Sequence, residues 1–337
     1  MKNCILIPTY PPHFQFVFKL LNSIEKYNTD KLKTKVYIVI SKNDYFVLKC
    51  ELDKCIFNKL TINVLTLEHI MESFGTSEKD THFYKHQSEP DPSSKNETRK
   101  CDRYSFQSIK KLLSIKYLIS DHNYELIYSL DSEGLFVRPF SMNHIFENYV
   151  NNKEIFFNSF QLGDSVSKLR CSNSKKILNT EHDVPGWLLE NYMWIYEKKI
   201  FEKFFDRILP KTNDINEITN IIVAGTFIEI LYYHFIFINN SEYNFTFLDT
   251  FSIFKKYIDK EVFRKISNEP YRLLEDVRLN LKNYPEILDD VSKIFNDYKI
   301  VNVKIDTSEQ CISLIKNTKI FLINSGDFKL NFKLNLE

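Results

Sequence analysis

Residues 125–133 read ELIYSLDSE, an apolar run that ends in two carboxylates one residue apart, Asp131 and Glu133. The β-forming side chains of the run, with a polar turn at 121–123 before it and Gly134 behind it, predict a short buried strand. In an open α/β sheet, ligands bind beyond the carboxyl ends of the central strands. Residues i and i+2 of an extended chain point to the same side, so we expect both carboxylates to face one ligand site.

Two anions on one side of a strand repel each other unless a cation lies between them. Mg²⁺ and Mn²⁺ take carboxylate oxygens and bridge to substrate phosphates, so Asp131 and Glu133 are candidate metal ligands. The alternative is a strand that ends in an acidic turn on a solvated surface.

Strand and helix patterns alternate on the amino-terminal side of this strand. Strands are predicted at 4–7, 35–41 and 62–67, and helices at 14–27, 43–53 (with Asn43 as a cap) and 104–119. This order predicts an α/β fold with a mostly parallel central sheet and helices on both faces. The polar stretch 72–103 is predicted to be a binding loop, a lid or a locally disordered segment.

The second half of the chain favours helices. We expect a loop at 162–185, a helix from 198 onward, a buried helix within 214–239, and strands at 319–323 and 329–334. We therefore predict one compact domain whose first half is 1–160 and whose second half, 161–337, ends in a helical elaboration. Trp187 and Trp194 are expected in the core, with stacking on a sugar as the alternative.

Composition excludes several functional classes. The formal net charge of +1 over 337 residues predicts no nucleic-acid partner. The six cysteines form no CxxC pair, which is typical of reduced thiols in a cytoplasmic protein. No apolar run reaches the roughly 18 residues that a membrane span needs, although peripheral contact with the inner membrane face stays open. Dinucleotide-binding, P-loop, serine-hydrolase and zinc-protease motifs are absent.

Three segments carry a resemblance to a known family: ILIPTYPPHFQFVFKLLNSI (5–24), VYIVIS (36–41) and ELIYSLDSE. Together they resemble GT-A-type glycosyltransferases, and more narrowly the bacterial enzymes that assemble capsular and lipopolysaccharide surface glycans. The resemblance implies that the first half binds a nucleotide sugar and that the second half binds the acceptor. It also implies that an acidic motif holds Mn²⁺ or Mg²⁺ against the donor diphosphate.

The implied site residues follow position by position. Asp131 and Glu133 match the acidic motif, with Glu where the family usually has Asp. The nucleotide would lie against the turn after the first strand and the residues after the second, which are Pro8, Thr9, Tyr10, Ser41 and Asn43.

Basic side chains before the acidic strand are candidates to meet phosphate, and Arg103 and Lys110 are the foremost of them. Arg99, Lys100 and Lys111 belong to the same cluster, and the alternative for the cluster is a solvated helix face. In the second half, the resemblance suggests Glu229 as the catalytic base, with burial raising its pKa. The alternative for Glu229 is a structural hydrogen bond. Asp183 and His182 are next in line as the catalytic base, and they are also candidates to line the acceptor site.

The implied function is the metal-dependent transfer of a sugar from a nucleoside diphosphate sugar to a surface glycan or a lipid-linked acceptor. Two other functions stay open. A nucleotidyltransferase of sugar activation also pairs carboxylates with Mg²⁺, but it usually has a glycine-rich phosphate loop after the first strand, and no glycine precedes Gly75 here. A non-catalytic glycan-assembly protein on the same fold is the second.

Overall fold

The computed structural model describes residues 1–75, 103–159, 165–190, 193–209, 226–268, 273–274 and 276–324, without the side chains of 103–106. Most of the predicted binding loop and the strand predicted at 329–334 lie outside these ranges. Within them, no helix combines the length and the apolarity that crossing a bilayer requires.

The central sheet has five strands in the order β3-β2-β1-β4-β7. The first four strands along the chain are parallel to one another, and β7 is antiparallel to its neighbour β4. This confirms the α/β class and the mostly parallel sheet. The carboxyl ends of β1–β4 therefore meet at one edge, which is where ligands bind in such sheets. The strands are β1 (Asn3–Pro8), β2 (Thr34–Ile40), β3 (Leu60–Thr66), β4 (Leu126–Ser129) and β7 (Ile195–Glu197).

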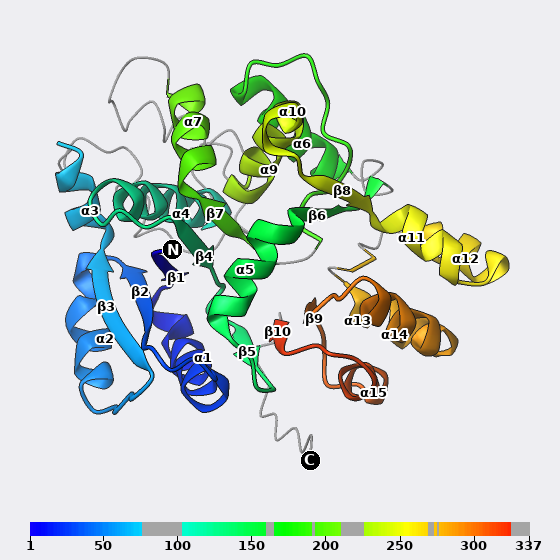
Figure 1. Cartoon of the computed structure of the whole chain (residues 1–337), viewed down its shortest axis with the longest axis horizontal. Helices are drawn as coiled ribbons and strands as arrows, with labels where there is room; N and C mark the ends of the chain where they lie inside the picture. Colours follow the sequence, from blue (N-terminus) through cyan, green and yellow to red (C-terminus); the bar gives the residue numbers. More distant parts are fainter. Residues whose placement is uncertain are drawn as a thin grey trace, which may run out of the picture.

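Helices cover both faces of this sheet, and the alternation of side chains along the strands explains why (Figure 1). In β1, Ile5 and Ile7 pack on one face, whereas Cys4 and Leu6 pack on the other. The first face is covered by α1 (Phe14–Tyr27), α2 (Tyr45–Leu52) and α5 (Met142–Asn152). The second is covered by α3 (Leu67–Ser73), α4 (Arg103–Ser120), α7 (Lys198–Ile208) and α9 (Ile228–Ile238).

Two of the predicted helices have clear sequence patterns. In α1, the buried residues Val17, Leu20, Leu21 and Ile24 recur at helical spacing, and the short 3₁₀ turn Pro11–His13 leads into the helix. Every residue of α9 from Ile228 to Ile236 is buried, as its all-round apolar sequence predicts.

A second lobe with its own apolar core is built mainly from residues 250–323 (Figure 1). This lobe contains a three-stranded sheet in the order β5-β10-β9, and a separate pair, β6 with β8, lies near α9 and α10. The strands are β5 (Gly134–Phe136), β6 (Glu154–Phe157), β8 (Thr246–Asp249), β9 (Asn302–Lys304) and β10 (Leu322–Asn324). The remaining helices are α6 (Ser165–Ile177), α10 (Asn240–Tyr243), α11 (Thr250–Tyr257), α12 (Lys260–Ser267), α13 (Val277–Asn283), α14 (Leu288–Asp297) and α15 (Glu309–Asn317).

Two local predictions are wrong. The loop predicted at 162–185 contains α6, a polar helix that packs on α9, where Ser174 Oγ and His234 Nδ1 lie 2.6 Å apart. Its sequence has too few apolar residues for a periodicity argument, so tertiary contact decides its structure. Asn43 caps no helix, because it lies inside the 3₁₀ turn Lys42–Asp44 and α2 begins only at Tyr45.

Candidate active site

Loops from neighbouring strands meet at the carboxyl edge of the central sheet. The backbone N–H of Thr9, after β1, donates to Val39 O of β2 at 2.9 Å. Beyond β4, Leu130 N donates to Leu6 O of β1 at the same distance. The residues after β1, β2 and β4 that were predicted to bind the donor are thus brought to one edge.

A buried ion cluster lies behind Asp131. Lys111 Nζ, from α4, lies 3.1 Å from Asp131 Oδ1 and 2.6 Å from Glu229 Oε1 of α9. The side chains of Lys111 and Glu229 are 5% and 3% exposed, whereas Asp131 is 18% exposed, so Asp131 is the member that reaches solvent. Gln107 Nε2 adds a long contact of 3.5 Å to the same Asp131 oxygen. Among the described residues, the two side-chain contacts of Asp131, with Lys111 and Gln107, both use Oδ1.

The charge of Lys111 is maintained by its neighbours. Burial acts to lower the pKa of this ammonium, but the carboxylates of Asp131 and Glu229 outweigh burial and hold the pKa above its ordinary value. The indole of Trp194 lies against the same ammonium, with Nζ 4.3 Å from the ring centroid. Trp194 immediately precedes β7, and its carbonyl accepts from Ser129 N at 2.9 Å, which places the ring beside the end of β4.

A second buried lysine supports the loop after β1. Lys110 Nζ donates to the carbonyl of Thr9 at 2.8 Å. Burial lowers the pKa of Lys110 to about 8, although the carboxylates of Glu68 and Asp44 act to raise it. Glu68, which follows β3, also accepts from Lys42 N at 2.8 Å. The alternative of a solvated helix face is therefore wrong for Lys110 and Lys111, which are each 4% exposed.

Glu133 has a different set of contacts from Asp131. Its Oε1 lies 3.3 Å from Nδ1 of His13, a buried residue of the 3₁₀ turn after β1. The expectation of two carboxylates on one face of a strand does not hold, because β4 ends at Ser129 and Gly134 N donates back to Asp131 O at 3.0 Å. The acidic motif thus lies in a turn, with Asp131 directed to α4 and Glu133 to the loop after β1.

A divalent metal ion bound here would need oxygen atoms from water and from a phosphate-bearing substrate in addition to the protein's carboxylates. Among the described residues, no three His, Cys, Asp or Glu side chains are placed to hold a metal ion together. Mg²⁺ typically binds through one or two carboxylates and completes its shell with water and substrate phosphates, so the two carboxylates suit that type of site.

Other predicted residues lie in separate surroundings. Asp183 is 82% exposed and pairs with Lys175 at 3.0 Å, and the carbonyl of His182 lies 3.0 Å from His234 Nε2. Neither therefore contacts the cluster around Asp131. Trp187, 1% exposed, belongs to the core, as predicted. The side chain of Arg103 lies outside the described part of the chain.

Three other predicted donor-site residues are at the edge itself. Pro8 is the last residue of β1, Ser41 is buried where β2 ends, and Asn43 is exposed just beyond it. His13 and Glu68 also lie at this edge but are not among the predicted site residues, and their one signal in the sequence is that each follows a predicted strand closely.

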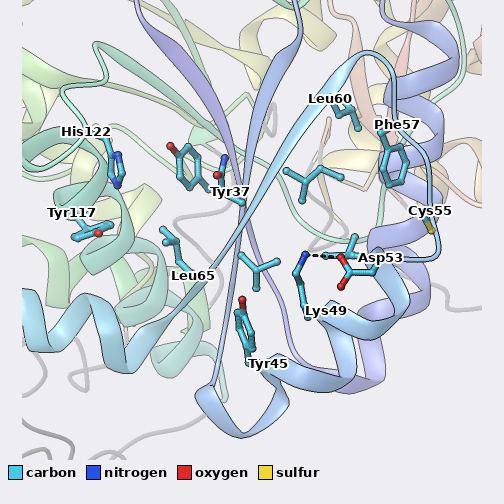
Figure 2. A pocket seen from close by; sticks show the side chains of 14 residues that line it. Tyr37, Tyr45, Lys49, Asp53, Cys55, Phe57, Leu60, Leu65, Tyr117 and His122 are labelled. Carbon is cyan, nitrogen blue, oxygen red and sulfur yellow. Dashed lines mark hydrogen bonds and ion pairs between the residues drawn. The ribbon is translucent and has the colours of Figure 1, made fainter.

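A separate groove of about 540 Å³ follows the outer edge of β3 (Figure 2). Aromatic rings from both faces of the sheet line it, among them Tyr37, Tyr45, Phe57 and Tyr117. The lining shares no residue with the predicted donor, metal or catalytic residues. The candidate active site is therefore defined by its converging contacts and not by this groove.

No protein-family model matches the chain, and no curated protein sequence matches it. Among solved structures, apo mouse xyloside xylosyltransferase 1 is similar with a TM-score of 0.41 and 10% identity, over 78% of this chain and 93% of that chain. The apo WbbM bifunctional glycosyltransferase is similar with a TM-score of 0.37 and 9% identity, over 67% of this chain and 38% of that one.

Proposed function

We propose that this protein is a glycosyltransferase that moves a sugar from a nucleoside diphosphate sugar to a glycan acceptor, with Mn²⁺ or Mg²⁺ as cofactor. One observation carries the proposal: a partly exposed carboxylate, Asp131, is held by a buried lysine at the carboxyl edge of a parallel sheet. A carboxylate fixed in this way offers Oδ2 to a ligand that arrives from the solvent side, and a metal–diphosphate complex is such a ligand.

The donor nucleotide would lie beside the loops after β1 and β2, where Thr9, Tyr10, Ser41 and Asn43 are found. Lys110 supports this assignment because it fixes the Thr9 carbonyl and thereby the course of the β1 loop. Lys110 acts here through the backbone, since its ammonium is buried.

Negative charge develops on the leaving diphosphate as its bond to the sugar breaks, and the site must neutralise this charge. A divalent ion, when bound by Asp131 and Glu133, supplies Lewis-acid neutralisation of that charge. The protein's own residues orient Asp131. Lys111 contacts one oxygen of the Asp131 carboxylate, and Glu229 in turn pairs with Lys111. This geometry favours a positioning role for Glu229, and its assignment as the catalytic base remains a prediction.

The acceptor is the least constrained part of the proposal. The sequence resemblance favours a surface polysaccharide, capsular or lipopolysaccharide, or its lipid-linked precursor, built on the cytoplasmic side of the membrane. Asp183 and His182 remain proposed acceptor-side residues.

A thermal-shift panel tests the proposal. Purified protein is heated with UDP, GDP or CMP, each with and without Mn²⁺, because a ligand that binds only the folded state raises the melting temperature. We expect one nucleoside diphosphate to stabilise the protein and Mn²⁺ to increase the effect. No shift with any nucleotide, with or without the metal, would count against a donor site.

A further inference from the structure

Strand β3 forms one edge of the central sheet. Its seven residues, LTINVLT, pair with β2 in a continuous parallel register from Leu60 to Thr66. Among the described residues, no strand pairs with the other side of β3, and the groove of about 540 Å³ follows that side (Figure 2). An edge strand of this length presents a row of backbone donors and acceptors with which another strand is able to pair.

The register with β2 shows which backbone groups of β3 are directed outward. Thr34 N, at the start of β2, donates to Lys59 O at 2.8 Å. The direction of the backbone groups alternates along a strand, so the N–H and C=O of Asn63 are also directed to β2. The N–H and C=O groups of Ile62 and Val64 are therefore directed to the groove.

The sequence of β3 has none of the features that keep edge strands apart. Natural edge strands carry charged side chains, prolines or bulges that block pairing with another chain. Between Leu60 and Thr66 there is no charged residue, no proline and no glycine. Two large apolar side chains adjacent in sequence to groove-lining residues are strongly exposed, Phe46 at 76% and Ile56 at 87%. Exposed apolar groups beside an unprotected edge strand are typical of an interface.

The charge of this edge suits a second copy of the same chain. The charged side chains that line the groove are Lys49 and Asp53, which pair with each other at 2.5 Å. Burial lowers the pKa of His122, so this lining residue adds no charge at neutral pH. In a two-fold interface a patch meets itself, so a patch with net charge is repelled by its own copy. The neutral edge of β3 lacks that repulsion.

The side chains of β3 are complementary to themselves in the antiparallel direction. When two copies overlap over the whole strand, Ile62 lies opposite Val64 of the second copy, and Asn63 lies opposite itself. Ile62 and Val64 both pack toward the apolar core on the α2 side of the sheet, so the two copies join their apolar faces. The Asn63 amide contains a donor and an acceptor, which lets it bond to its own copy. The outward backbone groups of Ile62 and Val64 form the hydrogen-bonded pairs of this register.

We propose that β3 pairs with β3 of a second copy about a two-fold axis at Asn63, so that the two central sheets become one continuous sheet. The axis keeps α2 of both copies on the same face of the sheet. Because each copy uses its own β3 edge, the assembly closes as a dimer and does not extend into a filament. The edge is separate from the candidate active site, so the dimer does not depend on the proposed function.

Sedimentation velocity of the full-length protein over a range of concentrations tests the dimer. We expect a monomer–dimer equilibrium for the wild type and a monomer for Ile62→Lys, because the introduced ammonium faces apolar Val64 of the second copy. Adding Val64→Glu to Ile62→Lys should restore the dimer, because each ammonium then faces a carboxylate of the other copy. Leu169→Lys, at an exposed residue of α6, is the matched control and should keep the dimer. A monomeric wild type, or a dimer that Ile62→Lys leaves intact, overturns the proposal.

Cysteine cross-linking tests the position of the axis without a variant that breaks the dimer. Directly opposed residues that share no hydrogen bond have Cα atoms about 4.5 Å apart in antiparallel strands, which is within reach of a disulfide. Asn63→Cys should therefore form a covalent dimer on mild oxidation. Thr61→Cys should not, because it lies opposite Leu65 of the second copy. The background has serine in place of Cys50, Cys55 and Cys101. No covalent dimer of Asn63→Cys, or equal yields from both variants, overturns the register.

Amide hydrogen exchange of the wild type distinguishes a second copy from another occupant of the edge. The N–H groups of Ile62 and Val64 should exchange slowly in the dimer and rapidly after dilution to the monomer. The N–H of Asn63 is directed to β2 and should exchange slowly in both states, which makes it the internal control. Slow exchange of Ile62 and Val64 that does not change on dilution would show that another segment or protein covers the edge, and it overturns the proposal.

Discussion

Lys111 Nζ and Glu229 Oε1 lie 2.6 Å apart although 118 positions separate them, so one buried ion pair joins α4 to α9. The same ammonium contacts Asp131 at 3.1 Å, which makes Asp131 the exposed end of a three-member cluster. Removing one member of a buried ion pair leaves an uncompensated charge, whose cost usually exceeds the net value of the pair. The cluster is thus both a stability element and the support of the candidate site.

Single substitutions in this cluster should destabilise the protein non-additively. We expect Lys111→Met to cost about 3–5 kcal/mol, because two carboxylates lose their cation, and Glu229→Gln to cost about 2 kcal/mol. The double variant should lose less than the sum, which urea unfolding would measure as a coupling energy. Glu242→Gln, which breaks an exposed pair with Lys203, is the control and should change stability little. If the losses of unfolding free energy in the two single variants simply add up in the double variant, Lys111 and Glu229 do not interact and the cluster is contradicted.

The catalytic readout of Glu229→Gln separates the two roles of this residue. A catalytic base predicts a large fall in kcat with donor affinity unchanged, while Tm falls under either role because the buried pair with Lys111 is weakened. The positioning role predicts that Tm and donor affinity fall together, because Asp131 loses its fixed orientation. Steady-state kinetics with calorimetry on the same preparation decides between them.

Asp131→Asn should abolish Mn²⁺-dependent nucleotide binding in a protein that stays folded. The amide keeps the shape of the side chain but removes the charge that faces the metal and Lys111. Asp53→Asn, at an exposed carboxylate paired with Lys49, is the control for the loss of one negative charge. Calorimetry measures the affinity and circular dichroism the fold. Unchanged Mn²⁺ dependence in Asp131→Asn would remove Asp131 from the site.

Lys110 predicts a pH dependence of stability. Its pKa falls from 10.5 in the unfolded chain to about 8 in the folded protein, so between these values the unfolded chain keeps a proton that the folded protein has released. Unfolding therefore takes up a proton in this window, and the stability contribution of Lys110 rises from pH 8 toward pH 10.5. Relative to Lys110→Met, the wild type should gain unfolding free energy between pH 8 and 10. Lys31→Met, at an exposed lysine, is the control. If the unfolding free energy of Lys110→Met changes with pH in the same way as that of the wild type, Lys110 does not have the buried environment described here.

Tryptophan fluorescence should report donor binding through Trp194. Its ring lies against Lys111, whereas Trp187 is 1% exposed in the core and contacts Phe227 edge-on. A metal–nucleotide complex that engages Asp131 shifts the charge beside Trp194, so emission should change in the wild type and in Trp187→Phe. The change should disappear in Trp194→Phe. If the emission change instead disappears in Trp187→Phe and persists in Trp194→Phe, the nucleotide binds elsewhere.

Much of the fold could be predicted because its elements have strong local patterns. Residues 14–27 were predicted as a helix and form α1 with the same bounds, since the apolar residues repeat at helical spacing over four turns. The strand run VYIVIS was likewise predicted to within a residue of β2. The polar helix α6 was missed because its stability comes from packing on α9, which local periodicity does not encode.

The site was predictable only in part, for a different reason. The position of Asp131 at a strand end follows from the sequence, but the turn after Ser129, which separates the contacts of Asp131 and Glu133, does not. Lys110 and Lys111 have the composition of a solvated helix face, and only the tertiary contact of α4 with β1 and α9 buries them. Glu229 could be predicted to be buried, but its partner on α4 could not.

Mass spectrometry of donor turnover tests the central claim most directly. The protein is incubated with a panel of UDP- and GDP-linked sugars and Mn²⁺, and each mixture is analysed for the released nucleoside diphosphate and free sugar. We predict that one donor is consumed by the wild type, that Asp53→Asn, at an exposed carboxylate paired with Lys49, consumes it at a similar rate, and that Asp131→Asn does not consume it. Consumption of that donor by Asp131→Asn at the wild-type rate, or of no donor by the wild type, would contradict the account.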